Sequence, residues 1–339
     1  MVNPREGILI MNSIGRTFLV GLFLVVVAMR SIHSIEQIPS KTDSFYIIWL
    51  PGLYGGHAEQ MSLVTTQNYA MYDVIKPAAD ADLGQERCIG DLERQLHNDQ
   101  TFQKANKVIV IGTSQGAATW LNEIARMTLA QQDHIAAIIL EAPLADANEA
   151  IMQSALKKPG VAYLPLVRFW SPWIAKLYHP FYNPYGLQAI TSVKQIAHRI
   201  PVIILHNKKD RRISVNSARR LVREFLTQRR SMLNNLYYIE TDIVAQRGDS
   251  HTDFLREDAQ AQAAFHAICK KLGLPYDKEQ AERLQDQDLK NFQPLVEQLD
   301  TAIDQSSWVS TMVRNVVDGV TLAVIAALLY MFISKRLKR

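Results

Sequence analysis

The 339-residue sequence contains little cysteine and no cluster of metal-ligand residues. Its two cysteines, Cys88 and Cys269, are too few for a disulfide framework and stand in no spacing typical of a metal site. They could pair with each other in an oxidising compartment, and the sequence alone leaves that open. We therefore expect a protein that needs no metal and no other cofactor.

An excess of one charge sign is also lacking, because 37 Lys and Arg residues stand against 33 Asp and Glu residues. The formal net charge of +4, without a long basic stripe, argues against nucleic acid as a partner. The sequence has no internal repeat and no low-complexity tract. A hydrophobic content of 48% is ordinary for a protein with a sizeable core, and the length accommodates one large domain plus further segments.

Short apolar segments alternate with helix-like segments through the middle of the chain. The expected strands are residues 45–50, 71–75, 108–111, 136–141, 202–206 and 236–240. Between them, residues 89–97 and 117–129 carry apolar side chains at the spacing of one helix face. Strands separated by helices need crossover connections, so the pattern predicts an α/β fold with a mostly parallel central sheet flanked by helices.

The most informative motif is Gly-Thr-Ser-Gln-Gly at residues 112–116, between an expected strand and an expected helix. A sharp turn there needs glycines, because a Cβ atom would clash with the neighbouring backbone. Such a turn is a nucleophile elbow, which presents the hydroxyl of Ser114 at the edge of the sheet. The alternative is an ordinary strand-to-helix turn with a solvent-exposed serine.

A nucleophilic serine needs a base, a group that orients the base, and donors for the oxyanion. Asp210 follows the expected strand 202–206, and His251 follows the expected strand 236–240. The carboxyl ends of parallel strands form the edge at which open α/β sheets hold ligands. The chain order Ser114, Asp210, His251 therefore predicts a catalytic triad. For Asp210, the alternative is a solvated surface acid among neighbouring cations.

The predicted oxyanion hole consists of two backbone amides. One belongs to Gln115, directly after the nucleophile, and the other to Leu53, in the glycine-containing turn 51–56. Glycines of a purely structural turn are the alternative. Among the other histidines, His206 ends a strand and reads as a core residue, whereas His57 could line the pocket. The remaining histidines are less well placed: His33, His97, His134, His179, His198 and His266.

These motifs resemble the α/β-hydrolase superfamily over roughly residues 44–272. The resemblance is carried by residues 112–116, 201–210 and 248–253, and Leu-Pro-Gly at 50–52 stands where the family usually has His-Gly. The stretch 196–210 is similar to the serine-peptidase-like and membrane-anchored branch. The resemblance implies an esterase, lipase, thioesterase or peptidase with a Ser/Asp/His triad.

Two segments interrupt or follow the expected hydrolase domain at residues 35–274. The insertion 144–200 is rich in aromatic residues, which is typical of a lid over a pocket, and packing of the insertion onto the body is the alternative. These aromatic residues are Tyr163, Phe169, Trp170, Trp173, Tyr178, Phe181, Tyr182 and Tyr185. Residues 275–310 are polar and acidic, and we interpret them as a solvated helical stalk or, alternatively, a partner-binding helix.

Both ends of the chain contain an apolar segment. Residues 17–29 would span about 20 Å as a helix, short of the roughly 30 Å hydrocarbon core, so residues 1–34 are interpreted as a signal sequence or an uncleaved signal anchor. The apolar segment 319–334 runs into Lys-Arg-Leu-Lys-Arg, and residues 311–339 are interpreted as a transmembrane helix with a cytosolic basic tail. This places the catalytic domain on the non-cytosolic side. A tail-anchored protein facing the cytosol and a buried core helix are the alternatives.

Together these features predict a membrane-tethered serine hydrolase that cleaves a lipophilic ester or thioester through an acyl-enzyme. The substrate would be an acyl-type small molecule or a lipid. Two other interpretations remain: a peptidase acting on small peptides, and a catalytically inactive hydrolase fold that serves as a membrane interaction module.

Overall fold

The computed structural model describes residues 45–52, 69–71, 82–148, 150–151, 175–176, 179–228, 235–244, 250–252, 254–303, 319–328 and 330. The chain divides into one unit at Met1–Thr42 and a second at Asp43–Arg339. The first unit, and with it the interpretation of residues 17–29 as a signal or anchor, lies outside the described residues.

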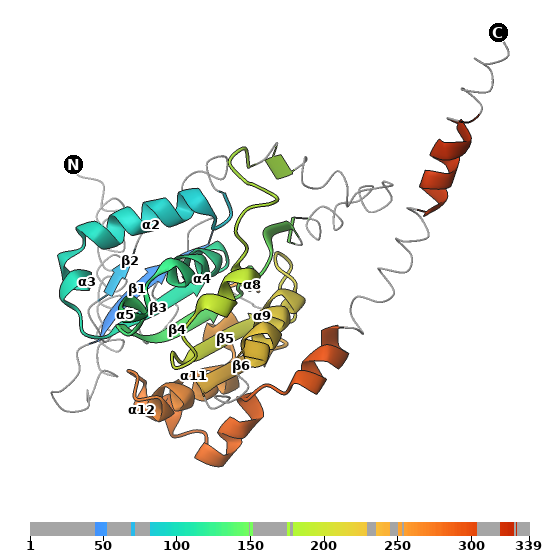
Figure 1. Cartoon of the computed structure of the whole chain (residues 1–339). Coiled ribbons are helices and arrows are strands. Elements are labelled where there is room, and N and C mark those ends of the chain that lie inside the picture. Colours follow the sequence, from blue (N-terminus) through green and yellow to red (C-terminus); the bar gives the residue numbers. More distant parts are fainter. Residues whose placement is uncertain are drawn as a thin grey trace, which may run out of the picture. The chain divides into compact units, whose positions relative to one another are not determined.

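Six parallel strands form one sheet in the order β2-β1-β3-β4-β5-β6 (Figure 1). The strands are β1 Tyr46–Leu50, β2 Tyr69–Met71, β3 Val108–Thr113, β4 Ile135–Glu141, β5 Val202–Asn207 and β6 Leu236–Thr241. The predicted α/β sheet is therefore confirmed, and every pairing among the described strands is parallel. The strand order reverses between β1 and β3, which is the position at which open α/β sheets bind ligands.

The helices connect these strands. They are α2 Glu86–Asn98, α3 Gln100–Lys104, α4 Gln115–Arg126, α5 Leu129–Gln132, α8 Ala189–Ser192, η4 Val193–Gln195, α9 Val215–Gln228, α10 Phe254–Glu257, α11 Ala259–Lys271, α12 Lys278–Ala281 and η6 Asp286–Phe292. The expected helix 117–129 is divided in two, because Thr128 caps a new helix: its hydroxyl oxygen accepts from the amide of Gln131, and the Gln131 side chain accepts from the amide of Thr128.

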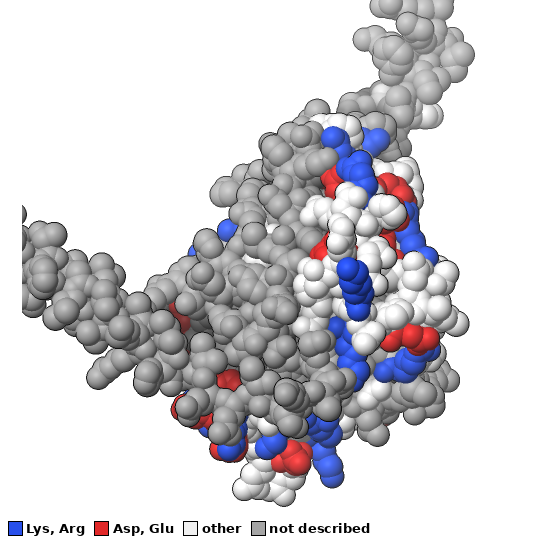
Figure 2. Space-filling model, turned by 90° about the vertical axis from the view of Figure 1, so that its left-hand side faces the viewer, with Lys and Arg blue, Asp and Glu red and all other residues white. Residues whose placement is uncertain are grey.

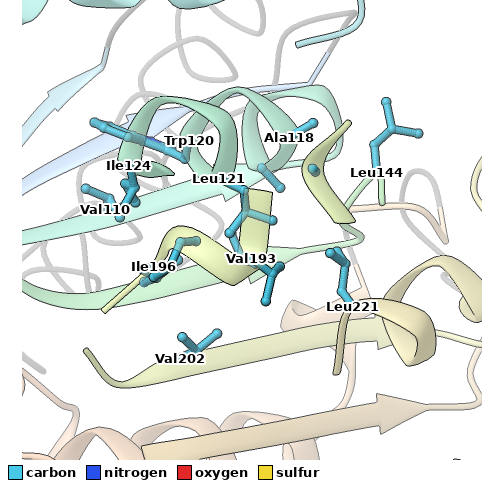
Figure 3. Close-up of a cluster of buried hydrophobic side chains, with 14 of the residues drawn as sticks. Val110, Ala118, Trp120, Leu121, Ile124, Leu144, Val193, Ile196, Val202 and Leu221 are labelled. Carbon is cyan, nitrogen blue, oxygen red and sulfur yellow. The ribbon is translucent and has the colours of Figure 1, made fainter. Parts of the chain in front are cut away.

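Alternate residues of each strand face opposite layers of the core. On one face, Val110 and Val202 pack with Trp120 and Leu121 of α4 and with Leu221 of α9 (Figure 3). On the other face, strand residues pack against α11, whose buried side chains include Phe265 and Ile268. The central strands are buried on both faces, which explains their nearly continuous apolar sequences.

The last part of the predicted lid belongs to the body of the domain. Val193 and Ile196 lie in the same core cluster as Leu121, as Figure 3 shows, and η4 packs against α4 and α9. Of the aromatic residues in this insertion, Tyr182 is buried, whereas Tyr185 is 97% exposed. The lid itself stays a prediction, because residues 152–174 lie outside the described residues.

Within the predicted stalk at residues 275–310, part of the segment 275–303 packs onto the domain. Leu289 and Leu299 are buried in the cores on the two faces of the sheet. In addition, Arg223 of α9 forms a 2.7 Å ion pair with Asp300. The segment is polar overall, but its widely spaced apolar residues are sufficient to pack it onto the domain. The stalk and the domain boundary at residue 274 stay predictions, because residues 304–318 lie outside the described residues.

The apolar C-terminal segment is described in part. Residues 319–328 are helical, and several of their apolar side chains are exposed. Within the parts of the chain that the structure describes, no helix reaches the length and apolar character that crossing a membrane requires.

The two cysteines lie on opposite faces of the sheet. Cys88 of α2 is buried in one core cluster and Cys269 of α11 in the other, and both are free thiols. The open question of their pairing is therefore answered: the central sheet separates them.

Candidate active site

Ser114 occupies a strained turn between β3 and α4. Its φ of 56° and ψ of −114° are unusual for a residue with a side chain, and such backbone strain costs about 1–3 kcal/mol. The flanking glycines make the turn feasible. A Cβ atom on Gly112 would lie 2.5 Å from Cα of Ala117, and one on Gly116 would lie 2.6 Å from the carbonyl oxygen of Pro51. The turn therefore has the geometry that a nucleophile elbow requires.

The turn after β1 lies directly on the Ser114 side chain. A Cβ atom on Gly52 would be 3.0 Å from Cβ of Ser114 and 3.6 Å from its Oγ. Gln115 is the first residue of α4, so its amide stands at the positive end of the dipole of a 12-residue helix. Leu53, the other predicted oxyanion donor, lies outside the described residues, and the oxyanion hole stays a prediction.

A buried network of hydrogen bonds joins the strand residues next to the elbow. The indole Nε1 of Trp49 donates to Oγ1 of Thr113 at 3.1 Å, and Thr113 donates to Oε2 of Glu141 at 3.1 Å. The amide of Ser114 also donates to the carbonyl oxygen of Glu141 at 2.8 Å. These hydrogen bonds link β1, β3 and β4 immediately before Ser114. Sequence reasoning missed this network, and its only signal was polar residues ending apolar strands.

Asp210 and His251 form a close, buried pair. Nδ1 of His251 lies 2.6 Å from Oδ2 of Asp210, and both side chains are almost fully buried. Oδ1 of Asp210 accepts from the amides of Arg212 at 2.7 Å and Ile213 at 3.0 Å. The alternative of a solvated surface acid is therefore wrong.

The environment keeps Asp210 ionised. Burial by itself raises the pKa of this carboxyl group, but hydrogen bonds from His206 and His251 outweigh burial, and the net pKa is well below its usual range. An ionised carboxylate can only accept, so the hydrogen in the short contact belongs to Nδ1 of His251. The other ring nitrogen, Nε2, is then the one able to accept a proton.

Asn207 holds the loop that carries His251. Its side-chain amide donates to the carbonyl oxygens of Ile243 at 2.8 Å and Ser250 at 3.2 Å, and so bridges the two sides of residues 245–249. Asn207 is fully buried at the end of β5. The sequence offered one signal for this role, which is a polar amide directly after the apolar run of a strand.

The cations beside Asp210 are engaged elsewhere. Lys208 pairs with Glu240 at 3.2 Å, and Lys209 pairs with Asp242 at 3.0 Å. In the described part of the face that Figure 2 shows, Lys and Arg lie interspersed with Asp and Glu.

All three predicted triad residues follow strands at the carboxyl edge of the sheet. Ser114 follows β3, Asp210 follows β5 and His251 lies after β6. Only β4 separates β3 from β5, a span of about 10 Å across two strand spacings. The structure brings Asp210 and His251 together, whereas the contact between the side chains of His251 and Ser114 stays a prediction.

The loop after β4 connects the two halves of the site. The amide of Leu144 donates to the carbonyl oxygen of Ser114 at 3.3 Å. The next amide, of Ala145, donates to Oγ of Ser217 at 2.8 Å, and Ser217 lies in the first turn of α9, shortly after Asp210. The elbow and the segment that carries Asp210 are thereby tied to one loop.

No protein-family model and no curated protein matches the sequence. Solved structures that resemble it include an esterase of Pyrococcus furiosus, with 17% identity, a TM-score of 0.43 and coverage of 68% of this chain and 83% of that one. A lipase-esterase related protein of Clostridium acetobutylicum has 12% identity, a TM-score of 0.41 and coverage of 64% and 90%. An acylaminoacyl peptidase of Pyrococcus horikoshii has 13% identity, a TM-score of 0.42 and coverage of 64% and 36%.

These likenesses are distant, so the fold assignment rests on features of the molecule itself. A parallel sheet with helices on both faces carries a strained Gly-x-Ser-x-Gly turn after β3, an aspartate after β5 and a histidine after β6. This combination characterises the α/β-hydrolase fold. The resemblance predicted from the sequence is therefore confirmed at the level of the fold.

Proposed function

We propose that this protein is a serine hydrolase in which Ser114 is the nucleophile, His251 the general base and Asp210 the group that orients the base. The observation that carries the proposal is the buried Asp210–His251 pair, which lies on the same edge of the sheet as the strained Ser114 turn. Strain of this kind persists only where the surrounding structure enforces it, and it is concentrated at functional sites.

The proposed reaction is acyl transfer to water. Oγ of Ser114 attacks the substrate carbonyl while its proton passes to Nε2 of His251, and Asp210 stabilises the imidazolium that forms. The amides of Gln115 and Leu53 stabilise the oxyanion. The tetrahedral intermediate then collapses, the leaving group takes the proton from His251, and an acyl-enzyme remains. Water, activated by the same imidazole, releases the acid and restores Ser114.

The proposed substrate is an ester or thioester with a lipophilic acyl group. The aromatic residues of 144–200 and the apolar segment 319–334 favour such a substrate and a membrane tether. Rates on soluble esters of increasing acyl length should rise from the shortest chains. Cleavage of short peptides without cleavage of esters would instead identify a peptidase.

A tethered chain should stay with the membrane fraction during alkaline carbonate extraction, and its release would remove the tether from the proposal.

The direct test is covalent labelling of the full chain with a fluorophosphonate probe, which reacts with activated serines. Labelling should occur in the native protein and disappear in Ser114→Ala. Ser192→Ala is a matched control, because Ser192 is a buried serine whose Oγ donates to Asn122 at 2.7 Å, and it should label normally. A folded native protein that neither labels nor cleaves esters would favour the inactive interaction module.

A further inference from the structure

A second histidine contacts the Asp210 carboxylate. His206 lies in β5, is 0% exposed, and its Nε2 is 3.3 Å from Oδ2 of Asp210. The same nitrogen is 3.2 Å from the carbonyl oxygen of Ile213. Both neighbours are acceptors, so Nε2 carries a hydrogen that the two oxygens share. The sequence suggested only a core residue here.

The other ring nitrogen fixes the tautomer of His206. Its Nδ1 is buried and has no hydrogen-bond partner among the described residues. A hydrogen on Nδ1 would be a buried donor without an acceptor, which is unfavourable. The ring is therefore held with its hydrogen on Nε2, directed at the carboxylate of Asp210.

With His206 included, the Asp210 carboxylate is fully coordinated. Oδ1 accepts from the amides of Arg212 and Ile213, and Oδ2 accepts from His251 and His206. A carboxylate offers about four acceptor positions, and all four are occupied. Each oxygen is thus held by two donors, which restrains rotation of the group about its χ2 torsion.

We propose that His206 is a positioning residue of the active site, which holds Oδ2 of Asp210 in line with Nδ1 of His251. This inference rests on the proposed function of the triad. His206 touches no reacting atom. It acts by restraining the carboxylate and by sharing its negative charge, which weakens the electrostatic interaction between the carboxylate and the ring of His251.

Among the described residues, Glu240 of β6 lies opposite His206 in the strand register, and its carboxylate is held by Arg219 of α9. Asp210 contacts His206 directly, and His251 contacts the same oxygen of Asp210. On the loop after β5, Lys208 and Lys209 are exposed and paired with Glu240 and Asp242 of β6 and the loop that follows it. Arg211 and Arg212, on the same loop, are exposed at the surface. A change at His206 therefore acts chiefly on the Asp210–His251 pair.

The kinetic test compares His206→Leu with His206→Gln, because the amide of Gln replaces the Nε2 donor and Leu does not. We expect His206→Leu to lower kcat about tenfold with KM nearly unchanged. We also expect the acid limb of the pH profile of kcat/KM to move to higher pH, by about half a unit or more. His206→Gln should keep both properties close to the native values. As a control, His266→Gln alters a buried histidine of α11 and should leave the pH profile unchanged.

A spectroscopic test on the resting protein separates this inference from the proposed function. The titration of His251, followed by ¹⁵N-histidine NMR, should move to higher pH in His206→Leu but not in His206→Gln. If the native protein labels with fluorophosphonate and this titration is the same in all folded variants, the role of His206 is refuted while the triad stands. If the titration shifts as expected but the native protein never labels, His206 does restrain the Asp210–His251 pair, and it is the enzymatic proposal that fails.

Discussion

Replacement of Gly116 by alanine tests whether the elbow depends on close contact between two backbone segments. The added Cβ would lie 2.6 Å from the carbonyl oxygen of Pro51 and closer still to that of Leu50, whereas real Cβ atoms do not approach within 3.0 Å. Both oxygens are main-chain atoms at the end of β1, so no side-chain rotation relieves the overlap. The elbow and the turn after β1 must separate.

The expected magnitude follows from two opposing effects. Alanine in place of glycine in a helix gains about 1 kcal/mol, because it restricts the unfolded chain. Overpacking costs about 1–3 kcal/mol, and the contact with two backbone oxygens places this site at or above the upper end. We therefore expect the free energy of unfolding to fall by about 2 kcal/mol. Separation of the elbow from the predicted oxyanion turn should also lower kcat, by about 100-fold for a displacement of about 1 Å.

The assay is urea unfolding of the full chain, followed by far-ultraviolet circular dichroism, together with ester hydrolysis. Gly90→Ala is the matched control, because Gly90 lies inside α2 and a Cβ atom there meets nothing within 4 Å. That variant should be more stable than the native protein by about 0.5–1 kcal/mol. If both substitutions change stability equally, or if Gly116→Ala keeps full activity, the argument from backbone contact is refuted.

Two further predictions concern buried polar groups. Thr113→Val breaks the link from Trp49 to Glu141, and it should cost about 1–3 kcal/mol of stability and reduce kcat. Thr119→Val should cost at most about 1 kcal/mol, because among the described residues the hydroxyl of Thr119 donates to one helix carbonyl, that of Gln115. Equal costs in the two variants would contradict a supporting role for the network of hydrogen bonds. Burial and the nearby Glu93 raise the pKa of Glu123 from 4.5 to about 7. The stability that its protonated form contributes is therefore fully present below pH 4.5, and it is lost as the pH rises through 7. Glu123→Gln should therefore stabilise the protein by about 1–2 kcal/mol at pH 8 and by little at pH 5, and an equal effect at both pH values would exclude this account.

The sequence predicted the sheet well because its strands are buried on both faces. Residues 108–111 and 202–206 are almost wholly apolar, and such runs leave little choice but a central parallel strand. The expected strand 71–75 overlaps β2 at Met71, and its residues 72–75 lie outside the described residues.

The composition of residues 275–303 did not reveal which of them pack onto the domain. Residues 275–303 read as a solvated stalk because their composition is acidic, yet a few apolar side chains such as Leu289 attach them to the domain. The number of polar residues in a segment says little about whether its rare apolar residues share one face. That depends on the path of the backbone, which composition does not specify.

The sequence by itself determined the strand order along the chain, the glycines of the elbow and the identity of Ser114, Asp210 and His251 as candidates, because each depends on local spacing. Tertiary structure alone decided the spatial order of the strands, the 2.6 Å contact between Asp210 and His251, and the approach of His206 to the same carboxylate. These are contacts between loops that follow different strands. Their geometry is set by how the parallel strands align at one edge of the sheet, which no local pattern of residues encodes.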